Sequence, residues 1–142
     1  MEIDNNAVEI LLVEDNPDDA ELAIRALKKH KLANNLMHLK DGEEAVNFLF
    51  SSQSPIPKLI LLDLKMPKID GIEILKKLKS DPQKKVIPVV VLTSSKEEKD
   101  IVESYRLGVN AYIVKPVDFE KFVSAVTEIG LFWLVLNQPP KQ

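Results

Sequence analysis

Four short apolar runs in this chain each end at a polar group that is able to take part in chemistry. Residues 10–13 precede Glu14 and Asp15, residues 59–62 precede Asp63, residues 89–92 precede Thr93, and residues 111–114 precede Lys115. Runs of this length, rich in aliphatic residues and separated by helical stretches, are typical of parallel strands buried on both faces of a sheet. Parallel strands share one carboxyl edge, where open α/β sheets bind ligands, so we expect these polar groups to converge.

Segments with helical periodicity lie between the apolar runs. The first is predicted to begin at Asn16 and Pro17, which suit a cap and a first helical position, and to bury Ala20, Ala23 and Leu27. The short segment 36–39 is typical of an edge strand. A strand followed by a helix, repeated five times, predicts one doubly wound α/β domain with helices on both faces of a parallel sheet.

Two later helices are predicted in more detail. Residues 96–107 are charged and sparsely apolar, and we expect Ile101, Val102 and Tyr105 to form their buried stripe, with Gly108 at the C-terminal cap. The last helix is predicted to begin near Asp118. It packs the apolar residues Phe119, Phe122, Val123 and Val126.

Length and composition limit the kinds of protein that this chain can be. The 142 residues suit a single domain, with a core over about 8–128. The 19 basic and 22 acidic residues form no basic stripe, which argues against a nucleic-acid partner, and the absence of cysteine excludes disulfides and thiolate metal sites. The start of the chain is unlike a signal peptide, and no apolar stretch approaches the roughly 20 residues that span a bilayer. We expect a soluble, cytoplasmic protein with no membrane partner.

Three carboxylates are predicted to meet at the sheet edge: Glu14, Asp15 and Asp63. Two like charges about 4 Å apart repel by roughly 4 kcal/mol at an effective dielectric constant of about 20. Such a cluster must either raise a pKa or hold a cation. Oxygen ligands with space for water favour Mg²⁺ over Ca²⁺. Asp18 and Asp19, in contrast, are interpreted as solvated acids that complement a helix dipole.

Asp63 is also placed for a second role. A carboxylate beside Mg²⁺, with the Thr93 hydroxyl and the Lys115 ammonium across the site, is arranged as a nucleophile for phosphoryl transfer. Metal and ammonium neutralise phosphoryl oxygens, and the hydroxyl donates to another.

As an ordered set, these motifs resemble the receiver domain of two-component response regulators, which has a CheY-like fold. Glu14-Asp15 match the acidic pair, Asp63 the phosphoacceptor, and Thr93 the switch hydroxyl, while Tyr112 matches the switch aromatic and Lys115-Pro116 the closing lysine and its proline. The resemblance covers about residues 8–126. It implies strand order 2-1-3-4-5 and a phosphoacceptor switch whose only chemistry is its own phosphorylation and dephosphorylation, rather than an enzyme.

The resemblance also implies roles for individual groups. Mg²⁺ is bound by Asp15, Asp63 and the backbone carbonyl of Lys65, with Glu14 acting through water. The phosphoryl group is bound by Thr93, Lys115 and the backbone amides of Leu64 and Ser94. The switch is formed by Thr93 and Tyr112, the Lys115-Pro116 bond is cis, and Lys65 and Ser95 tune dephosphorylation.

A narrower resemblance concerns the partner. Residues 13–21, 115–119 and 130–134 look similar to stand-alone receivers that partner bacterial phytochrome-type histidine kinases. This implies phosphorylation by a sensor histidine kinase or a phosphotransfer protein, followed by partner binding or onward relay. The downstream target is not specified by the sequence.

Three other functions compete with this interpretation. A phosphatase of the haloacid dehalogenase type also uses a strand-end Asp with Mg²⁺, but Lys65 occupies the position of its general acid. A nucleotide- or flavin-binding fold expects glycines in the first turn, where Glu14 and Asp15 would repel a phosphate. A pseudo-receiver that acts only as a scaffold would not need every acid that this chain keeps.

Residues 129–136 form an aromatic and aliphatic run beyond the predicted core. They are expected to extend the last helix, with Phe132 and Trp133 at the surface of a homodimer, because a single domain covers only one side of a helix. The alternative is that Gly130 breaks the helix and the tail packs on its own domain.

Overall fold

The computed structural model describes residues 9–31 and 35–131. Within them, five strands alternate with five helices, in the order β1 (Ile10–Val13), α1 (Pro17–Lys29), β2 (Leu36–Leu39), α2 (Gly42–Leu49), β3 (Leu59–Leu62), α3 (Gly71–Lys79), β4 (Val89–Thr93), α4 (Glu98–Arg106), β5 (Ala111–Val114) and α5 (Phe119–Leu131). The strands form one parallel sheet in the order β2-β1-β3-β4-β5. The predicted α/β fold and its strand order are confirmed.

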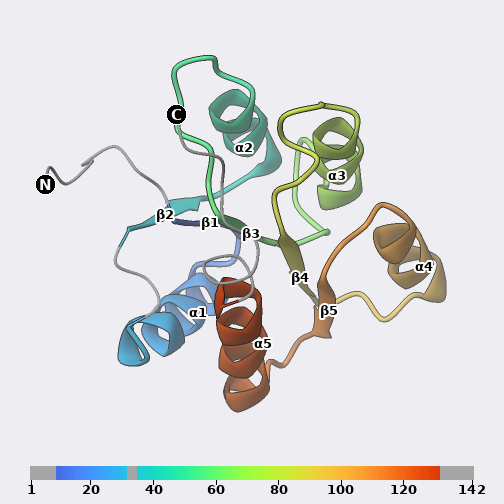
Figure 1. Ribbon diagram of the computed structural model, residues 1–142. Coiled ribbons are helices and arrows are strands. Elements are labelled where there is room, and N and C mark those ends of the chain that lie inside the picture. Colours follow the sequence, from blue (N-terminus) through green and yellow to red (C-terminus); the bar gives the residue numbers. More distant parts are fainter. Residues whose placement is uncertain (1–8, 32–34, 132–142) are drawn as a thin grey trace, which may run out of the picture.

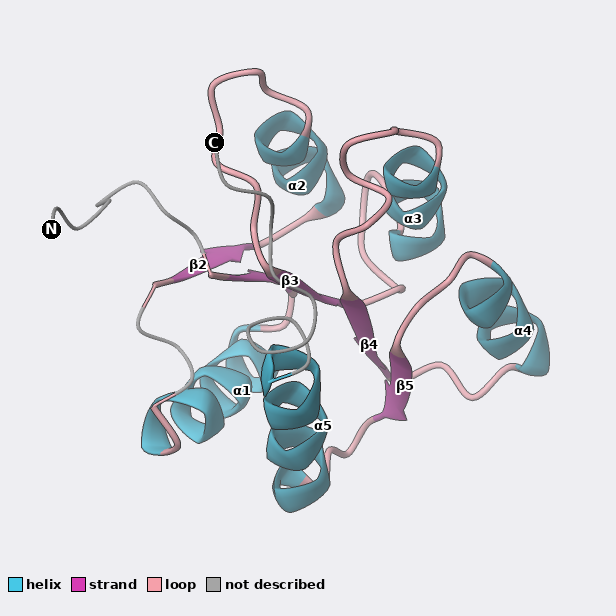
Figure 2. Ribbon diagram, in the orientation of Figure 1, coloured by secondary structure: helices cyan, strands magenta, loops and turns pink. Residues whose placement is uncertain are grey.

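The sheet separates two layers of helices, with α1 and α5 on one face and α2, α3 and α4 on the other (Figures 1 and 2). Alternate residues of each strand enter different hydrophobic clusters, as the two-residue period of a strand requires. Leu11 and Val13 pack with residues of α2 and α3, whereas Ile10 and Leu12 pack with residues of α1 and α5. Each helical layer therefore has its own core.

The pairing register brings the strand ends to one edge. Val13 of β1 pairs with Leu62 of β3, so Glu14 and Asp63 follow side by side. Thr93 at the end of β4 pairs with Val114, the residue before Lys115. The polar groups that follow the apolar runs therefore converge, as predicted.

Helix α4 departs from its predicted packing. Its buried residues are Asp100 and Ser104, while Val102 and Tyr105 are 46% and 51% exposed and Ile101 is half-buried. The predicted apolar stripe is wrong, because the side chains that α4 turns inward are polar, and Asp100 contacts Ser95 and Lys65 in the loops after β4 and β3. Strand β5 is also only half-buried, since it lies at the sheet edge rather than inside it.

The helix ends follow the predicted chemistry. Asn16 caps α1, and Gly108, just beyond α4, has a φ of 91° that favours glycine. Helix α5 passes through Gly130 and reaches Leu131. Phe132 and Trp133 lie outside the described residues, so the homodimer surface stays a prediction. No helix in the described part is both long and apolar enough to cross a bilayer.

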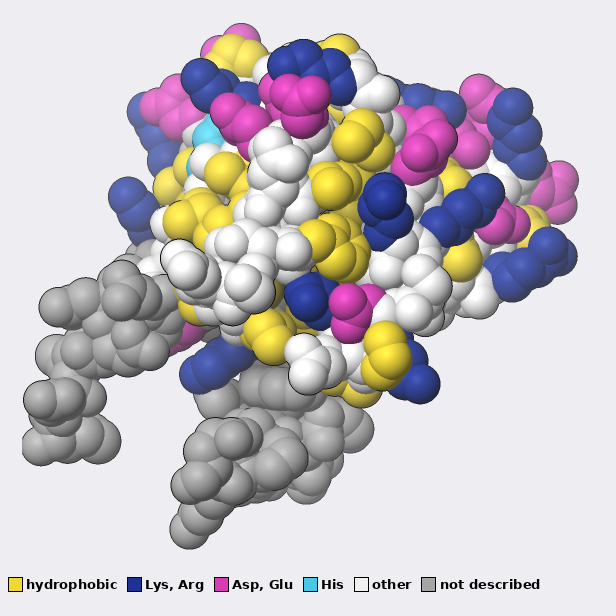
Figure 3. Space-filling view, turned by 90° about the horizontal axis from the view of Figure 1, so that it is seen from above, with side chains coloured by type: hydrophobic (Ala, Val, Ile, Leu, Met, Phe, Trp, Pro, Cys, Tyr) yellow, Lys and Arg dark blue, Asp and Glu magenta, His cyan; other side chains and the backbone are white. Residues whose placement is uncertain are grey.

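Acidic and basic side chains are mixed over the surface that is visible in Figure 3. On this face, the dark blue Lys and Arg side chains are interspersed with magenta Asp and Glu side chains.

Candidate functional site

Three carboxylates meet at the carboxyl edge of β1 and β3. One oxygen atom from each of Glu14, Asp15 and Asp63 lies within 4.8 Å of the other two. Glu14 is 2% exposed and Asp63 4% exposed, whereas Asp15 faces solvent. Such a cluster of hard oxygen atoms is typical of a divalent-metal site, and its exposed side leaves access for an ion with its water.

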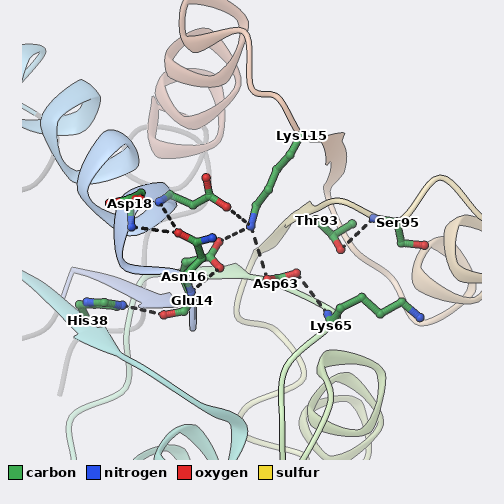
Figure 4. Close-up of polar contacts among 10 residues, drawn as sticks. Glu14, Asn16, Asp18, His38, Asp63, Lys65, Thr93, Ser95 and Lys115 are labelled. Atoms are coloured by element: carbon green, nitrogen blue, oxygen red, sulfur yellow. Dashed lines mark hydrogen bonds and ion pairs between the residues drawn. The ribbon is translucent and has the colours of Figure 1, made fainter.

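Lys115 joins this cluster from the end of β5 (Figure 4). Its Nζ atom lies 2.7 Å from Glu14 Oε1, 2.9 Å from Asp19 Oδ2 and 3.4 Å from Asp63 Oδ2. The peptide bond between Lys115 and Pro116 is cis. Asp19 is therefore not simply a solvated acid: it comes from the first turn of α1, one helical turn after the acidic pair, and forms an ion pair with the same ammonium.

The charges of this site are unbalanced. Burial raises the pKa of Glu14 to about 7, and the charge of Asp63 acts in the same direction, although the hydrogen bond from Lys115 opposes them. Burial by itself would lower the pKa of Lys115, but its bonds to Glu14 and Asp19 and the charge of Asp63 outweigh burial, and its pKa is raised. One ammonium does not neutralise these acids, so the site favours an added cation.

Local contacts fix the orientation of the acids. The backbone N–H of Asn16 donates to Glu14 Oε2 at 3.2 Å, and the Nε2 atom of His38 lies 2.8 Å from the backbone carbonyl oxygen of Glu14. The backbone N–H of Lys65 donates to Asp63 Oδ1 at 3.2 Å. A Cβ atom at position 71 would come within 2.5 Å of the backbone oxygen of Asp63, so only Gly71 allows α3 to start this close.

The loop after β4 connects Thr93 and Tyr112, the two residues that are predicted to form the switch. Ser95 donates its backbone N–H to Thr93 Oγ1 at 3.3 Å, and the Tyr112 hydroxyl donates to the Ser95 carbonyl at 3.0 Å. Tyr112 is half-buried, and the centroid of its ring lies 6.5 Å from that of Tyr105 in α4. The hydroxyl, the aromatic ring and α4 are thus connected through this loop.

Asp100 borders the site from α4, and sequence reasoning missed it. Its Oδ2 atom accepts from Ser95 Oγ at 2.6 Å and lies 3.0 Å from Lys65 Nζ. The bond from Ser95 and then the bond from Lys65 lower the pKa of Asp100. No local signal could have singled out Asp100, because residues 96–106 carry several charged side chains at similar spacings.

A comparison with protein families settles the class of the chain. Residues 10–127 match the model of the response regulator receiver domain. The chain belongs to this family.

Curated and solved relatives agree with this assignment. Response regulator Rcp1 of Synechocystis sp. is 44% identical over 129 residues, which are 88% of this chain and 88% of Rcp1. The structure of its Mn²⁺-bound form has a TM-score of 0.77 at 42% identity, and covers 94% of this chain and 99% of that one.

Two further structures are of phytochrome response regulators. The phosphorylated cyanobacterial phytochrome response regulator RcpA is 41% identical with a TM-score of 0.76, over 95% of this chain and 99% of RcpA. The bacteriophytochrome response regulator RtBRR is 48% identical with a TM-score of 0.77, over 94% of this chain and 84% of RtBRR.

The family match decides two of the three competing functions. A receiver domain is a phosphoacceptor switch in two-component signalling rather than a catalytic enzyme. The phosphatase and nucleotide-binding interpretations are therefore wrong. The acidic cluster of Glu14, Asp15 and Asp63 lies where a receiver has its divalent-metal site.

Proposed function

We propose that this receiver takes a phosphoryl group from the phosphohistidine of a sensor histidine kinase onto Asp63. The observation that carries the proposal is the position of Asp63, a buried carboxylate 3.4 Å from the Lys115 ammonium and grouped with Glu14 and Asp15. In the transfer, a carboxylate oxygen of Asp63 attacks phosphorus, the P–N bond breaks, and its electron pair stays on the kinase imidazole.

Mg²⁺ is the metal that fits this donor set. We assign Asp15, Asp63 and the backbone carbonyl of Lys65 as its ligands, with Glu14 acting through water. The donors are all oxygen atoms, and few carboxylates with room for water suit Mg²⁺. When bound, the ion supplies positive charge that offsets the carboxylates and the incoming phosphoryl oxygens.

The remaining groups bind the phosphoryl oxygens. Lys115, already beside Asp63, supplies a positive charge, and the hydroxyl of Thr93 donates a hydrogen bond. The backbone amides of Leu64 and Ser94, each following a strand-end residue of the site, are further donors. Donors fixed before the reaction stabilise transferred charge because they need no reorganisation.

The kinase partner that we propose is of the phytochrome type. RcpA and RtBRR are phytochrome and bacteriophytochrome response regulators, and they are 41% and 48% identical to this chain over more than nine tenths of its length. Two such matches support the same class of upstream kinase here. A histidine phosphotransfer protein would serve the same chemistry.

Phosphorylation is proposed to act on α4 through Thr93 and Tyr112. Movement of the Thr93 hydroxyl toward the phosphoryl group changes the loop that Tyr112 holds at the Ser95 carbonyl. This transmits the state of Asp63 to the surface formed by α4, β5 and α5.

Incubation with acetyl phosphate and Mg²⁺, followed by intact mass measurement, tests the acceptor and the metal. The wild type should gain one phosphoryl group, whereas Asp63→Asn should gain none and Asp15→Ala should lose Mg²⁺-dependent labelling. Asp18→Asn, which changes an exposed acid of the same turn, is the matched control and should label normally. Label on Asp63→Asn, or on a histidine, would refute the assignment.

Transfer from purified kinases tests the partner. A bacteriophytochrome kinase labelled on histidine should pass its phosphoryl group to this receiver faster than an unrelated sensor kinase at equal concentration. Equal rates would remove the phytochrome proposal without affecting Asp63 as the acceptor.

A further inference from the structure

Asp100 connects α4 with two loops that border the acceptor. Its Oδ2 atom receives the Ser95 hydroxyl, from the loop after β4, and the Lys65 ammonium, from the loop after β3. The side chain of Asp100 is 11% exposed, and that of Lys65 is 50% exposed. A single carboxylate oxygen on α4 therefore holds groups from both loops.

Lys65 lies between the acidic cluster on one side and Asp100 on the other. Its own backbone N–H contacts Asp63 Oδ1, so the residue starts beside the acidic cluster. Its side chain nevertheless runs away from Asp63 toward the side of Ser95 (Figure 4), and its ammonium ends at Asp100. The cluster of Glu14, Asp15 and Asp63 carries more negative charge than Lys115 balances, and it would attract a second ammonium that was free to turn.

We propose that Asp100 is a positioning residue for the metal site. It holds the Lys65 ammonium on the α4 side and so prevents this cation from competing with the divalent metal for the acidic cluster. The inference rests on the proposed metal site. It adds Asp100, a residue of α4 whose carboxylate contacts Ser95 and the Lys65 ammonium rather than the acidic cluster.

The same contact links α4 to the chemistry. If α4 moves outward, Asp100 moves with it and Lys65 is released toward the acids. A partner that holds α4 inward then favours metal binding, and by reciprocity metal binding favours that position of α4.

Calorimetric titration of the full chain with Mg²⁺ tests the inference without phosphorylation. Asp100→Asn keeps an oxygen acceptor for Ser95 but removes the charge that attracts Lys65. We expect it to bind Mg²⁺ about two- to fivefold more weakly, the range that a partly exposed ion pair supports. The double variant Asp100→Asn/Lys65→Met should regain wild-type affinity, since no ammonium is left to compete. Glu103→Gln is the matched control, because it also replaces a carboxylate of α4 by an amide, but at a residue that is paired with Arg106. It should bind Mg²⁺ as the wild type does.

Labelling by acetyl phosphate provides a second measurement. Asp100→Asn should need more Mg²⁺ for half-maximal labelling, by the same factor, while its maximal rate at saturating Mg²⁺ is unchanged. A merely structural defect would lower that maximal rate instead and would persist in the double variant. The inference is overturned if Asp100→Asn binds Mg²⁺ as the wild type does, or if the double variant stays weak. A wild type that binds no Mg²⁺ would refute the proposed metal site itself, and the two failures are thus distinct.

Discussion

Helices α1 and α4 both border the site, but they are held by different means. At the start of α1, the Asn16 side chain accepts hydrogen bonds from the backbone N–H groups of Asp18 and Asp19, at 2.9 and 3.1 Å. The helix then buries an apolar face that includes Ala23 and Leu27. Capping and burial stabilise α1 independently of the charges at the site.

Helix α4 has neither support. Glu97 at its N-terminal cap makes no side-chain capping bond, and the residues that it buries are Asp100 and Ser104. Its apolar residues Val102 and Tyr105 are about half-exposed. The contrast is that capping and apolar burial stabilise α1, whereas the buried carboxylate of α4, Asp100, is held by Ser95 and Lys65, which lie in the loops beside the acceptor.

Truncation of one apolar side chain on each helix gives the largest expected difference. Leu27→Ala removes a fully buried side chain and should lower the free energy of unfolding by about 2–5 kcal/mol. Val102→Ala should change it by less than about 0.5 kcal/mol, because this side chain is exposed. Urea unfolding followed by circular dichroism measures both. Leu22→Ala, at an exposed position of α1, controls for the loss of a leucine. A loss of unfolding free energy in Val102→Ala similar to that in Leu27→Ala would contradict the comparison.

The helix caps provide the next contrast. Asn16→Ala should cost about 1 kcal/mol, because two backbone donors of α1 lose their acceptor. Glu97→Ser supplies α4 with a capping hydroxyl at an extended residue and should stabilise the protein by a similar or smaller amount. The same unfolding measurement applies. If Glu97→Ser destabilised the protein, the ion pair of Glu97 with Lys99 would be contributing more to α4 than a capping hydroxyl does.

The sequence predicted α1 correctly and α4 incorrectly for one physical reason. Apolar periodicity identifies the buried face of a helix only when hydrophobic burial determines its orientation. That condition holds for Ala23 and Leu27. It fails for α4, where Asp100 is drawn inward by Lys65 and Ser95, and no local pattern shows that these two residues lie beneath it.

Removal of the Tyr112 hydroxyl tests how much β5 contributes to holding α4. Tyr112→Phe keeps the ring beside Tyr105 but loses the bond to the Ser95 carbonyl, at a cost of about 1 kcal/mol. Hydrogen exchange should become faster at the amides of α4 and stay unchanged at those of α1. Equal protection of α4 in both proteins would show that this bond does not restrain the helix. Tyr105→Phe, which removes the hydroxyl of an exposed residue of α4 itself, is the matched control.

The positions of the site residues were predicted more completely from the sequence than the packing of the helices around them. Glu14, Asp63 and Lys115 each follow an apolar run, and strand pairing alone brings such ends together. The ion pair of Lys115 with Asp19 was missed, because an acid in a first helical turn is ordinarily explained by the helix dipole. Whether it instead reaches a lysine depends on where β5 ends relative to α1, and that distance is a property of the whole fold.

A small stabilising effect is expected from a substitution of Ser104. Within the described residues, its hydroxyl is buried and makes no hydrogen bond. A buried hydroxyl without a partner costs free energy, and alanine has the higher helix propensity, so Ser104→Ala should stabilise the protein by about 0.5–1 kcal/mol. Ser124→Ala, at an exposed position of α5, measures the propensity gain alone, and the difference between the two variants isolates the unpaired hydroxyl. A loss of stability in Ser104→Ala would show that this hydroxyl is bonded in solution, and that α4 is held more firmly than its exposed apolar residues indicate.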